Sequence, residues 1–139
     1  MDTDATRSLI EEYYAALPTG KRDRIAALLA PDCEWIPPAS APIEPLKGAE
    51  AIADALGAQV VKTMFDLSQP FRLDVHRTVV DGNVAVVQQR IQATAKATGK
   101  AYDNEYCWVY ICENGKIARM EEYADTMVAA DAMGWGAAS

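Results

Sequence analysis

The chain has 139 residues, of which 50% are hydrophobic, and a formal net charge of −7. This length fits one domain with a substantial core. The negative charge argues against nucleic acid or an anionic membrane surface as a partner, because both attract basic proteins. No apolar run approaches the roughly 20 residues of a membrane span. The three cysteines, an odd number, and an acidic N-terminus without a signal-peptide pattern predict a cytoplasmic protein with reduced thiols.

The first half of the chain predicts helices. Hydrophobic side chains recur at helical spacing in residues 3–17 and 48–65, and residues 21–30 form a shorter candidate. Pro18 follows the segment 3–17 and Pro31 follows the segment 21–30, and we expect each proline to end its helix. We expect a short strand at 33–36 and an irregular, proline-rich loop at 37–45.

The second half changes to the spacing of strands. Long strand candidates occupy residues 71–80, 83–97, 101–111 and 116–125. The short turns between them are typical of hairpins. This order predicts an α+β fold in which a curved antiparallel sheet wraps around three N-terminal helices as a cone. We expect a single domain over residues 1–139, in which about 127–139 form a C-terminal tail with one helical turn before it frays.

Three stretches carry a resemblance to a known family. They are "YYAAL…IAALLAPDCEWIPP", "PLKGAEAIADAL" and "NEYCWVYICENGKIARMEEYADT". The chain resembles the nuclear transport factor 2-like superfamily, which includes ketosteroid isomerases, limonene epoxide hydrolases and polyketide-cyclase-like proteins. The resemblance covers nearly the whole chain and implies the cone fold with an internal pocket. It says less about function, because this fold hosts enzymes and non-enzymes alike.

Hairpin registers predict which strand residues share a face. A two-residue turn at 98–99 pairs Gln92 with Glu105, and a three-residue loop at 113–115 pairs Glu105 with Tyr123. One face then carries Gln88, Arg90, Gln92, Asp103, Glu105, Glu121, Tyr123 and Asp125. The other carries Val87, Ile91, Tyr106, Trp108, Tyr110 and Met120.

Two orientations of this sheet are open. In the first, the polar face meets water and the aromatic face is the core under the helices. The resemblance favours the second, because an arginine and two aspartates project into the cone of the epoxide hydrolases, and Arg90 and Asp125 match that arginine and one aspartate. The polar face would then line the pocket. An outward face carrying Tyr106, Trp108 and Tyr110 would be a large apolar patch, so we expect a homodimer through it.

The candidate catalytic residues in this orientation are Asp125, Arg90 and Tyr13. Asp125 would be the base and Arg90 its orienting partner, although a structural ion pair is the alternative. Tyr13 matches the tyrosine that donates to the oxyanion in ketosteroid isomerases. Packing between a helix and the sheet is the favoured explanation for a tyrosine at this position. The patterns of both enzyme classes are incomplete: Gln92 stands in place of the second aspartate of the hydrolases, and Pro37 in place of the isomerase base.

The candidate substrate-binding residues suit a small molecule with one or two polar atoms. They are Trp35, Leu17, Leu56, Val60, Met64, Gln92, Glu105 and Tyr123. The leading hypothesis is an enzyme that performs acid–base isomerisation, hydration or elimination on a small apolar cyclic compound, without a metal or nucleotide cofactor. The alternatives are a non-catalytic ligand-binding module and a dimeric scaffold of the same fold. The sequence assigns no role to His76 or Cys33.

Overall fold

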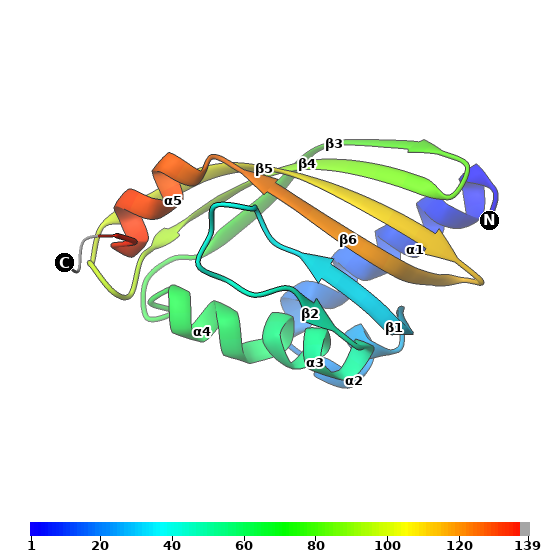
Figure 1. Ribbon diagram of the computed structural model, residues 1–139, viewed down its shortest axis with the longest axis horizontal. Coiled ribbons are helices and arrows are strands. Elements are labelled where there is room, and N and C mark those ends of the chain that lie inside the picture. The colour runs from blue at the N-terminus through cyan, green and yellow to red at the C-terminus, as the bar shows by residue number, and fades with distance from the viewer. Residues whose placement is uncertain (137–139) are drawn as a thin grey trace.

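The computed structural model describes residues 1–136, with the exception of the Ala58 side chain. The helices are α1 (Thr3–Ala16), α2 (Arg22–Ala26), α3 (Ala49–Asp54), α4 (Val60–Met64) and α5 (Thr126–Met133) (Figure 1). The strands are β1 (Leu29–Ile36), β2 (Leu46–Lys47), β3 (Arg72–Asp81), β4 (Val84–Thr94), β5 (Ala101–Glu113) and β6 (Lys116–Ala124). They form one sheet in the order β2-β1-β6-β5-β4-β3.

The helices expected at 3–17 and 48–65 are present, but the helix expected at 21–30 spans only Arg22–Ala26. Leu29 already begins β1, and Pro31 lies within that strand instead of ending a helix. The Asp2 carboxylate accepts a hydrogen bond from the Ala5 amide at 2.8 Å and caps α1. The apolar stripe of α1 is buried, and a short 3₁₀ turn at Leu17–Thr19 ends the helix at a left-handed Gly20. The predicted helix at 48–65 consists of α3 and α4 joined by a π-helical segment at Ala55–Gln59.

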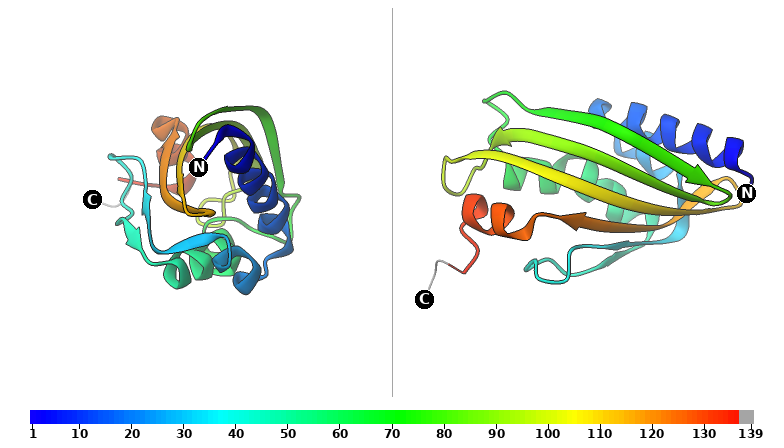
Figure 2. Two further views of the ribbon diagram at one scale, coloured as in Figure 1. Left: turned by 90° about the vertical axis from the view of Figure 1, so that its right-hand side faces the viewer. Right: turned by 90° about the horizontal axis from the view of Figure 1, so that it is seen from above.

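The sheet confirms the α+β cone. Its pairs are antiparallel except for β1 and β6, which run parallel and join the first and last strands of the chain. The sheet curves around the helices without closing, and α1 to α4 lie on one side of it (Figure 2). The short strand expected at 33–36 extends over Leu29–Ile36 because β6 gives it a long-range partner.

Both predicted registers are wrong by two residues. Gln92 lies opposite Asp103 instead of Glu105, because the loop between β4 and β5 is longer than two residues. Tyr123 lies opposite Cys107, because a two-residue turn and a bulge replace the three-residue loop before β6. A shift of two positions leaves every side chain on its own face. The grouping of the strand residues into two faces is therefore confirmed, except for Asp125, which lies beyond the end of β6.

The favoured orientation of the sheet is wrong. Trp108 is 7% exposed and Tyr110 1% exposed, while Tyr123 on the other face is 57% exposed. The aromatic face is the core under the helices, since burying large aromatic area is the stronger driving force. The surface expected to hold a second copy through Tyr106, Trp108 and Tyr110 is thus inside the chain. We call the aromatic side the inner face and the polar side the outer face.

The predicted tail begins as a regular helix. The Asp125 carboxylate accepts hydrogen bonds from the amides of Met127 and Val128, at 3.1 and 3.2 Å, and caps α5. The fraying expected at the end of this tail falls on residues 137–139, which lie outside the described part of the chain. Within residues 1–136, no helix is both long enough and apolar enough to cross a membrane.

Candidate active site

The structure separates the three predicted catalytic residues. Arg90 lies on the outer face, where its guanidinium donates two hydrogen bonds to Asp103, at 2.8 and 2.6 Å. This pairing lowers the pKa of the Asp103 carboxyl below its usual range. Asp125 caps α5, and Tyr13 is buried beneath the inner face. Arg90 therefore pairs with Asp103 rather than with Asp125, and it lies across the sheet from Tyr13.

The predicted substrate-binding residues divide in the same way. The apolar members pack in or against the core; they are Trp35, Leu17, Leu56, Val60 and Met64. The polar members lie on the outer face; they are Gln92, Glu105 and Tyr123. The two groups do not line one cavity, because the sheet stands between them.

The inner face carries one glutamate that the sequence analysis left unassigned. Glu122 lies directly opposite Trp108 in the register of β5 and β6, so it projects among aromatic side chains. Its Oε1 accepts a hydrogen bond from Trp35 Nε1 at 3.0 Å. Burial raises the pKa of Glu122 from its ordinary 4.5 to about 7, and the Trp35 hydrogen bond only partly opposes this shift. This carboxyl can accordingly exchange a proton near neutral pH.

A signal for Glu122 was present in the sequence. In the alternation of β6, it shares a face with Met120, while Glu121 shares a face with Tyr123. A glutamate in phase with buried apolar residues is unusual, because burying a carboxyl without a cation is costly. The partner Trp35 could not be predicted, since it comes from the parallel pairing of β1 with β6.

Aromatic rings surround this carboxyl. The rings of Trp35 and Trp108 have their centroids 6.1 Å apart, and Trp108 stacks on Tyr110 at 5.8 Å with nearly parallel planes. The Trp108 indole nitrogen is buried without a hydrogen-bond partner. On the same strand, the hydroxyl of Tyr102 accepts a hydrogen bond from Asn104 Nδ2 at 2.9 Å. The inner face near Glu122 thus combines aromatic rings with a few polar atoms.

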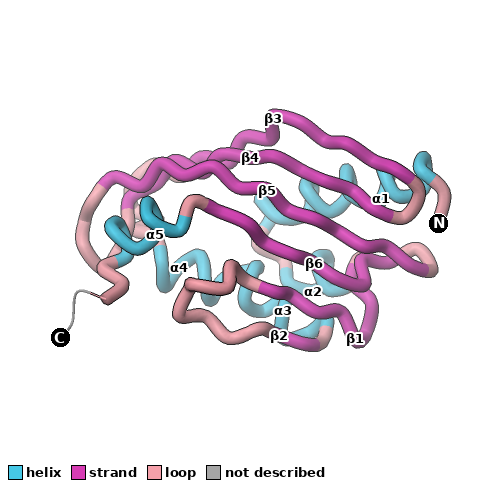
Figure 3. The backbone as a smooth tube through the Cα atoms, turned by 45° about the horizontal axis from the view of Figure 1, so that its top comes forward, coloured by secondary structure: helices cyan, strands magenta, loops and turns pink. Residues whose placement is uncertain are grey.

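Glu122 lies where the sheet begins to open. The last pair between β1 and β6 is Ile36 with Glu121. After Ile36, the chain continues as the loop 37–45 and no longer pairs with β6 (Figure 3). Glu122 is the next residue along β6, and it is half-buried rather than fully enclosed.

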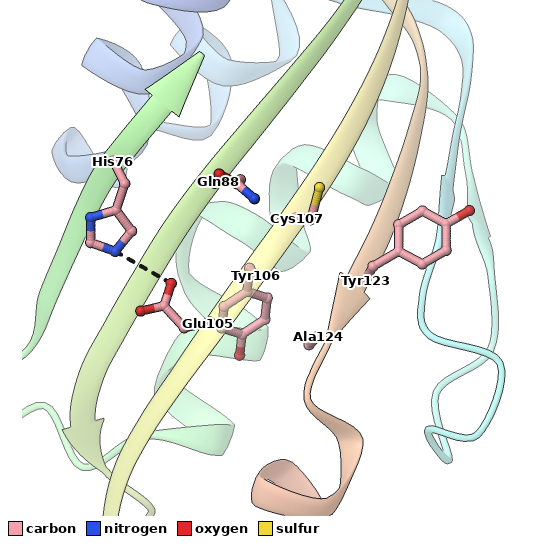
Figure 4. Close-up of a pocket in the computed structure, with 7 residues that line it drawn as sticks. All are labelled: His76, Gln88, Glu105, Tyr106, Cys107, Tyr123 and Ala124. Carbon is pink, nitrogen blue, oxygen red and sulfur yellow. Dashed lines mark ion pairs between the residues drawn. The ribbon is translucent and has the colours of Figure 1, made fainter. Parts of the chain in front are cut away.

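A shallow depression of about 390 Å³ also marks the outer face (Figure 4). His76 Nε2 lies 3.3 Å from Glu105 Oε2 across it, beside Gln88, Cys107 and Tyr123. Both members of this ion pair are exposed, and exposed pairs are screened by water. Among the described residues, no group of three or more His, Cys, Asp or Glu side chains is arranged to hold a metal ion. The inner-face carboxyl is therefore the stronger candidate for chemistry.

Comparison with known sequences identifies the family. The model of the SnoaL-like domain matches residues 10–120, which is most of the chain. The chain belongs to the SnoaL-like domain family. Among curated proteins, none matches it. The matched range of the SnoaL-like domain ends two positions before Glu122.

Solved structures share the SnoaL-like fold at low sequence identity. An NTF2-like protein from Burkholderia xenovorans LB400 is 23% identical, with a TM-score of 0.80 over 96% of this chain and 98% of its own. A candidate SnoaL-like polyketide cyclase from Jannaschia sp. CCS1 is 16% identical, with a TM-score of 0.76 over 96% and 94%. An LEH-like epoxide hydrolase from Mycobacterium tuberculosis is 17% identical, with a TM-score of 0.69 over 97% and 93%. At these identities, the likeness shows the fold alone.

Proposed function

We propose that this SnoaL-like domain is an acid–base enzyme acting on a small apolar cyclic compound, and that Glu122 takes and returns the proton. The observation that carries the proposal is a single half-buried carboxyl on an aromatic inner face, with a pKa raised to about 7. General acids and bases work best when their pKa lies near the working pH. With a pKa of about 7, both the ionised and the protonated form of Glu122 are present near neutral pH.

The surroundings of Glu122 support proton transfer rather than ion pairing. Its hydrogen-bond donor is the neutral indole of Trp35 and not a cation, so the carboxyl stays basic when ionised. The neutral form can donate a proton to a leaving oxygen or a carbanion. Isomerisation, hydration and elimination each need these two steps, and none of them needs a redox partner.

The apolar walls support a small cyclic substrate. Trp35 and Trp108 offer ring faces beside the carboxyl, and the partly buried side chains of Leu56, Val60 and Met64 pack against the same core. Flat or cyclic hydrocarbons bury area well against such rings. In this proposal, Asp125 and Arg90 stabilise the fold rather than touch the substrate.

The test is turnover by Glu122→Gln against a matched control. The protein is screened with cyclic enones, ketones and epoxides in D₂O, and proton exchange and product formation are followed by NMR. Glu122→Gln should lower kcat by about 10²–10⁴-fold, the usual contribution of a general acid or base. Glu121→Gln, one residue away on the outer face, should leave kcat unchanged.

Two outcomes would contradict the proposal. If Glu122→Gln keeps full turnover, another group moves the proton. If compounds of this panel raise the melting temperature of the wild-type protein without being transformed, the domain is a ligand-binding module, because binding alone stabilises the folded state.

A further inference from the structure

The two edges of the sheet differ in how well they are protected against further pairing. An edge strand presents unpaired backbone N–H and C=O groups, and proteins blunt such edges with short strands, lysine or proline. One edge is β2, which is two residues long, contains Lys47 and follows Pro45. The other edge is β3, whose ten residues include neither lysine nor proline (Figure 3). Of the two edges, β3 alone offers a long strand to a partner.

Apolar side chains of β3 are exposed along this edge. Val75 is 43% exposed and Val79 is 54% exposed, whereas the valines of the neighbouring β4 are half-buried or buried. Val75 lies on the inner face, where it and Thr78 line a groove of about 240 Å³ between β3 and α1. Val79 lies on the outer face, opposite Val86. A strand added along β3 would cover both exposed valines and close the groove.

A β-bulge determines which strand can match β3 over its whole length. The register of β3 with β4 shifts between Val75 and Arg77, because His76 is an extra residue. Before the bulge, even-numbered side chains belong to the outer face, and after the bulge odd-numbered ones do. Directly opposed residues of two strands share a face. An antiparallel strand with the same bulge therefore matches β3 face for face when the first half of one strand lies along the second half of the other.

The charges of β3 are complementary in the longest pairing of this kind. Arg72 then lies opposite the partner's Asp81, and the same pair recurs at the other end of the ladder. Opposite charges in such positions are favourable. Val75 lies opposite the partner's Thr78, so each copy brings inner-face side chains to the groove of the other. A shift of two positions in one direction would instead set Asp74 against the partner's Asp81, which is unfavourable.

We propose that a second copy of this chain pairs antiparallel with β3, edge to edge, so that the two sheets become one. Backbone hydrogen bonds on both sides of the bulge and two ion pairs hold the copies together. Small interfaces are weak, so we expect a dimer that dissociates on dilution. The inference is independent of the proposed function, because β5 and β4 separate β3 from Glu122 on β6.

The test follows the mass of the full chain by sedimentation velocity over a range of concentrations. The monomer has a mass of 15.1 kDa, and we expect the dimer to increase with concentration. Asp81→Arg sets arginines against each other at both ends of the ladder and should raise the dissociation constant about tenfold. Arg72→Asp sets aspartates against each other and should have a similar effect.

The double variant Arg72→Asp/Asp81→Arg should restore the dimer, because it exchanges the two charges of each pair. Within one chain, these residues stand at opposite ends of a ten-residue strand, about 30 Å apart. Recovery in the double variant therefore cannot come from a contact inside one copy. A double variant that dimerises no better than the two single variants overturns the inference.

A second pair of variants compares the edge with the outer face. Val75→Lys puts a charge into the groove and should weaken the dimer, while Val109→Lys on the outer face of β5 should leave it unchanged. If Val109→Lys breaks the dimer and Val75→Lys does not, the second copy lies on the outer face and the inference fails.

Amide exchange of the wild-type chain tests the same inference without any substitution. The amides of β3 should exchange more slowly at high protein concentration than at low concentration, because pairing protects them. The amides of β5, which already pairs on both sides, should exchange equally at the two concentrations. A chain that stays monomeric at its highest soluble concentration, or a dimer that leaves β3 exchange unchanged, overturns the inference.

Discussion

The two faces of the sheet shift the pKa of a carboxyl group in opposite directions. On the outer face, Asp103 lies in water beside the Arg90 guanidinium, and the pKa of its carboxyl is lowered. On the inner face, Glu122 has a tryptophan N–H and aromatic rings as neighbours, and its pKa is raised to about 7. One sheet thus separates a carboxyl whose pKa is lowered from one whose pKa is raised. Burial and neighbouring groups, rather than residue type, set the difference between these two pKa values.

The largest difference in stability should appear between a positive charge placed on the inner face and one placed on the outer face. Trp108→Arg removes a large buried ring and brings a guanidinium into the core opposite Glu122. We expect a loss of roughly 3 kcal/mol or more in the free energy of unfolding, because the lost packing and the cost of burying two charges exceed their attraction. Val109→Arg, the next residue on the outer face, should cost less than about 1 kcal/mol. Urea denaturation measures both. Equal losses at the two positions would contradict the assignment of faces.

The second effect concerns the pH dependence of stability. The pKa of Glu122 is raised in the folded state, so its proton is held more tightly there than in the unfolded chain. Stability is then lost as the pH rises from about 4.5 to about 7, by up to roughly 3 kcal/mol. Glu122→Gln removes this loss and should therefore be more stable than the wild type at pH 8, with little difference at pH 4. Parallel stability curves for the two proteins would show that Glu122 does not titrate as described.

A smaller effect belongs to Asp125, where β6 ends and α5 begins. Asp125→Ala removes the cap and should destabilise the protein by about 1 kcal/mol, with faster amide exchange in the first turn of α5. Asp125→Asn keeps a capping oxygen and should change stability very little. Loss of turnover in Asp125→Asn with unchanged stability would instead return this residue to the catalytic role that the sequence suggested.

The smallest effect is expected for the outer-face pair. Asp103→Asn removes one partner of an exposed ion pair, and such pairs contribute little. Because the pKa of Asp103 is lowered in the folded state, its contribution is present above the unfolded pKa and disappears as the pH falls through the folded value. The stability difference from wild type should thus vanish in acid and shrink in high salt. A difference that grows toward low pH would be inconsistent with this pairing.

The sequence predicted the fold better than the site. Alternation along the strands grouped the residues of each face correctly, even though both turns were assigned the wrong length, because an error of two positions preserves the faces. Alternation does not say which face the helices cover when one face is rich in Tyr and Trp and the other contains valine and tyrosine. Matching Arg90 and Asp125 to a family pattern then favoured the wrong side. The inner-face position of Glu122 could have been found by asking which acid shares a face with Met120.

The hydrogen bond between Trp35 and Glu122 has a consequence for the timing of folding. It joins residues 87 positions apart, on the first and last long strands of the chain. The two strands pair in parallel, and closing so long a loop is slow compared with forming the hairpins of β3 to β6. On a ribosome, β1 has to wait until β6 has been synthesised before it can take its place in the sheet. The contact between Trp35 and Glu122 therefore forms late, after the helices and hairpins that a nascent or truncated chain can already contain.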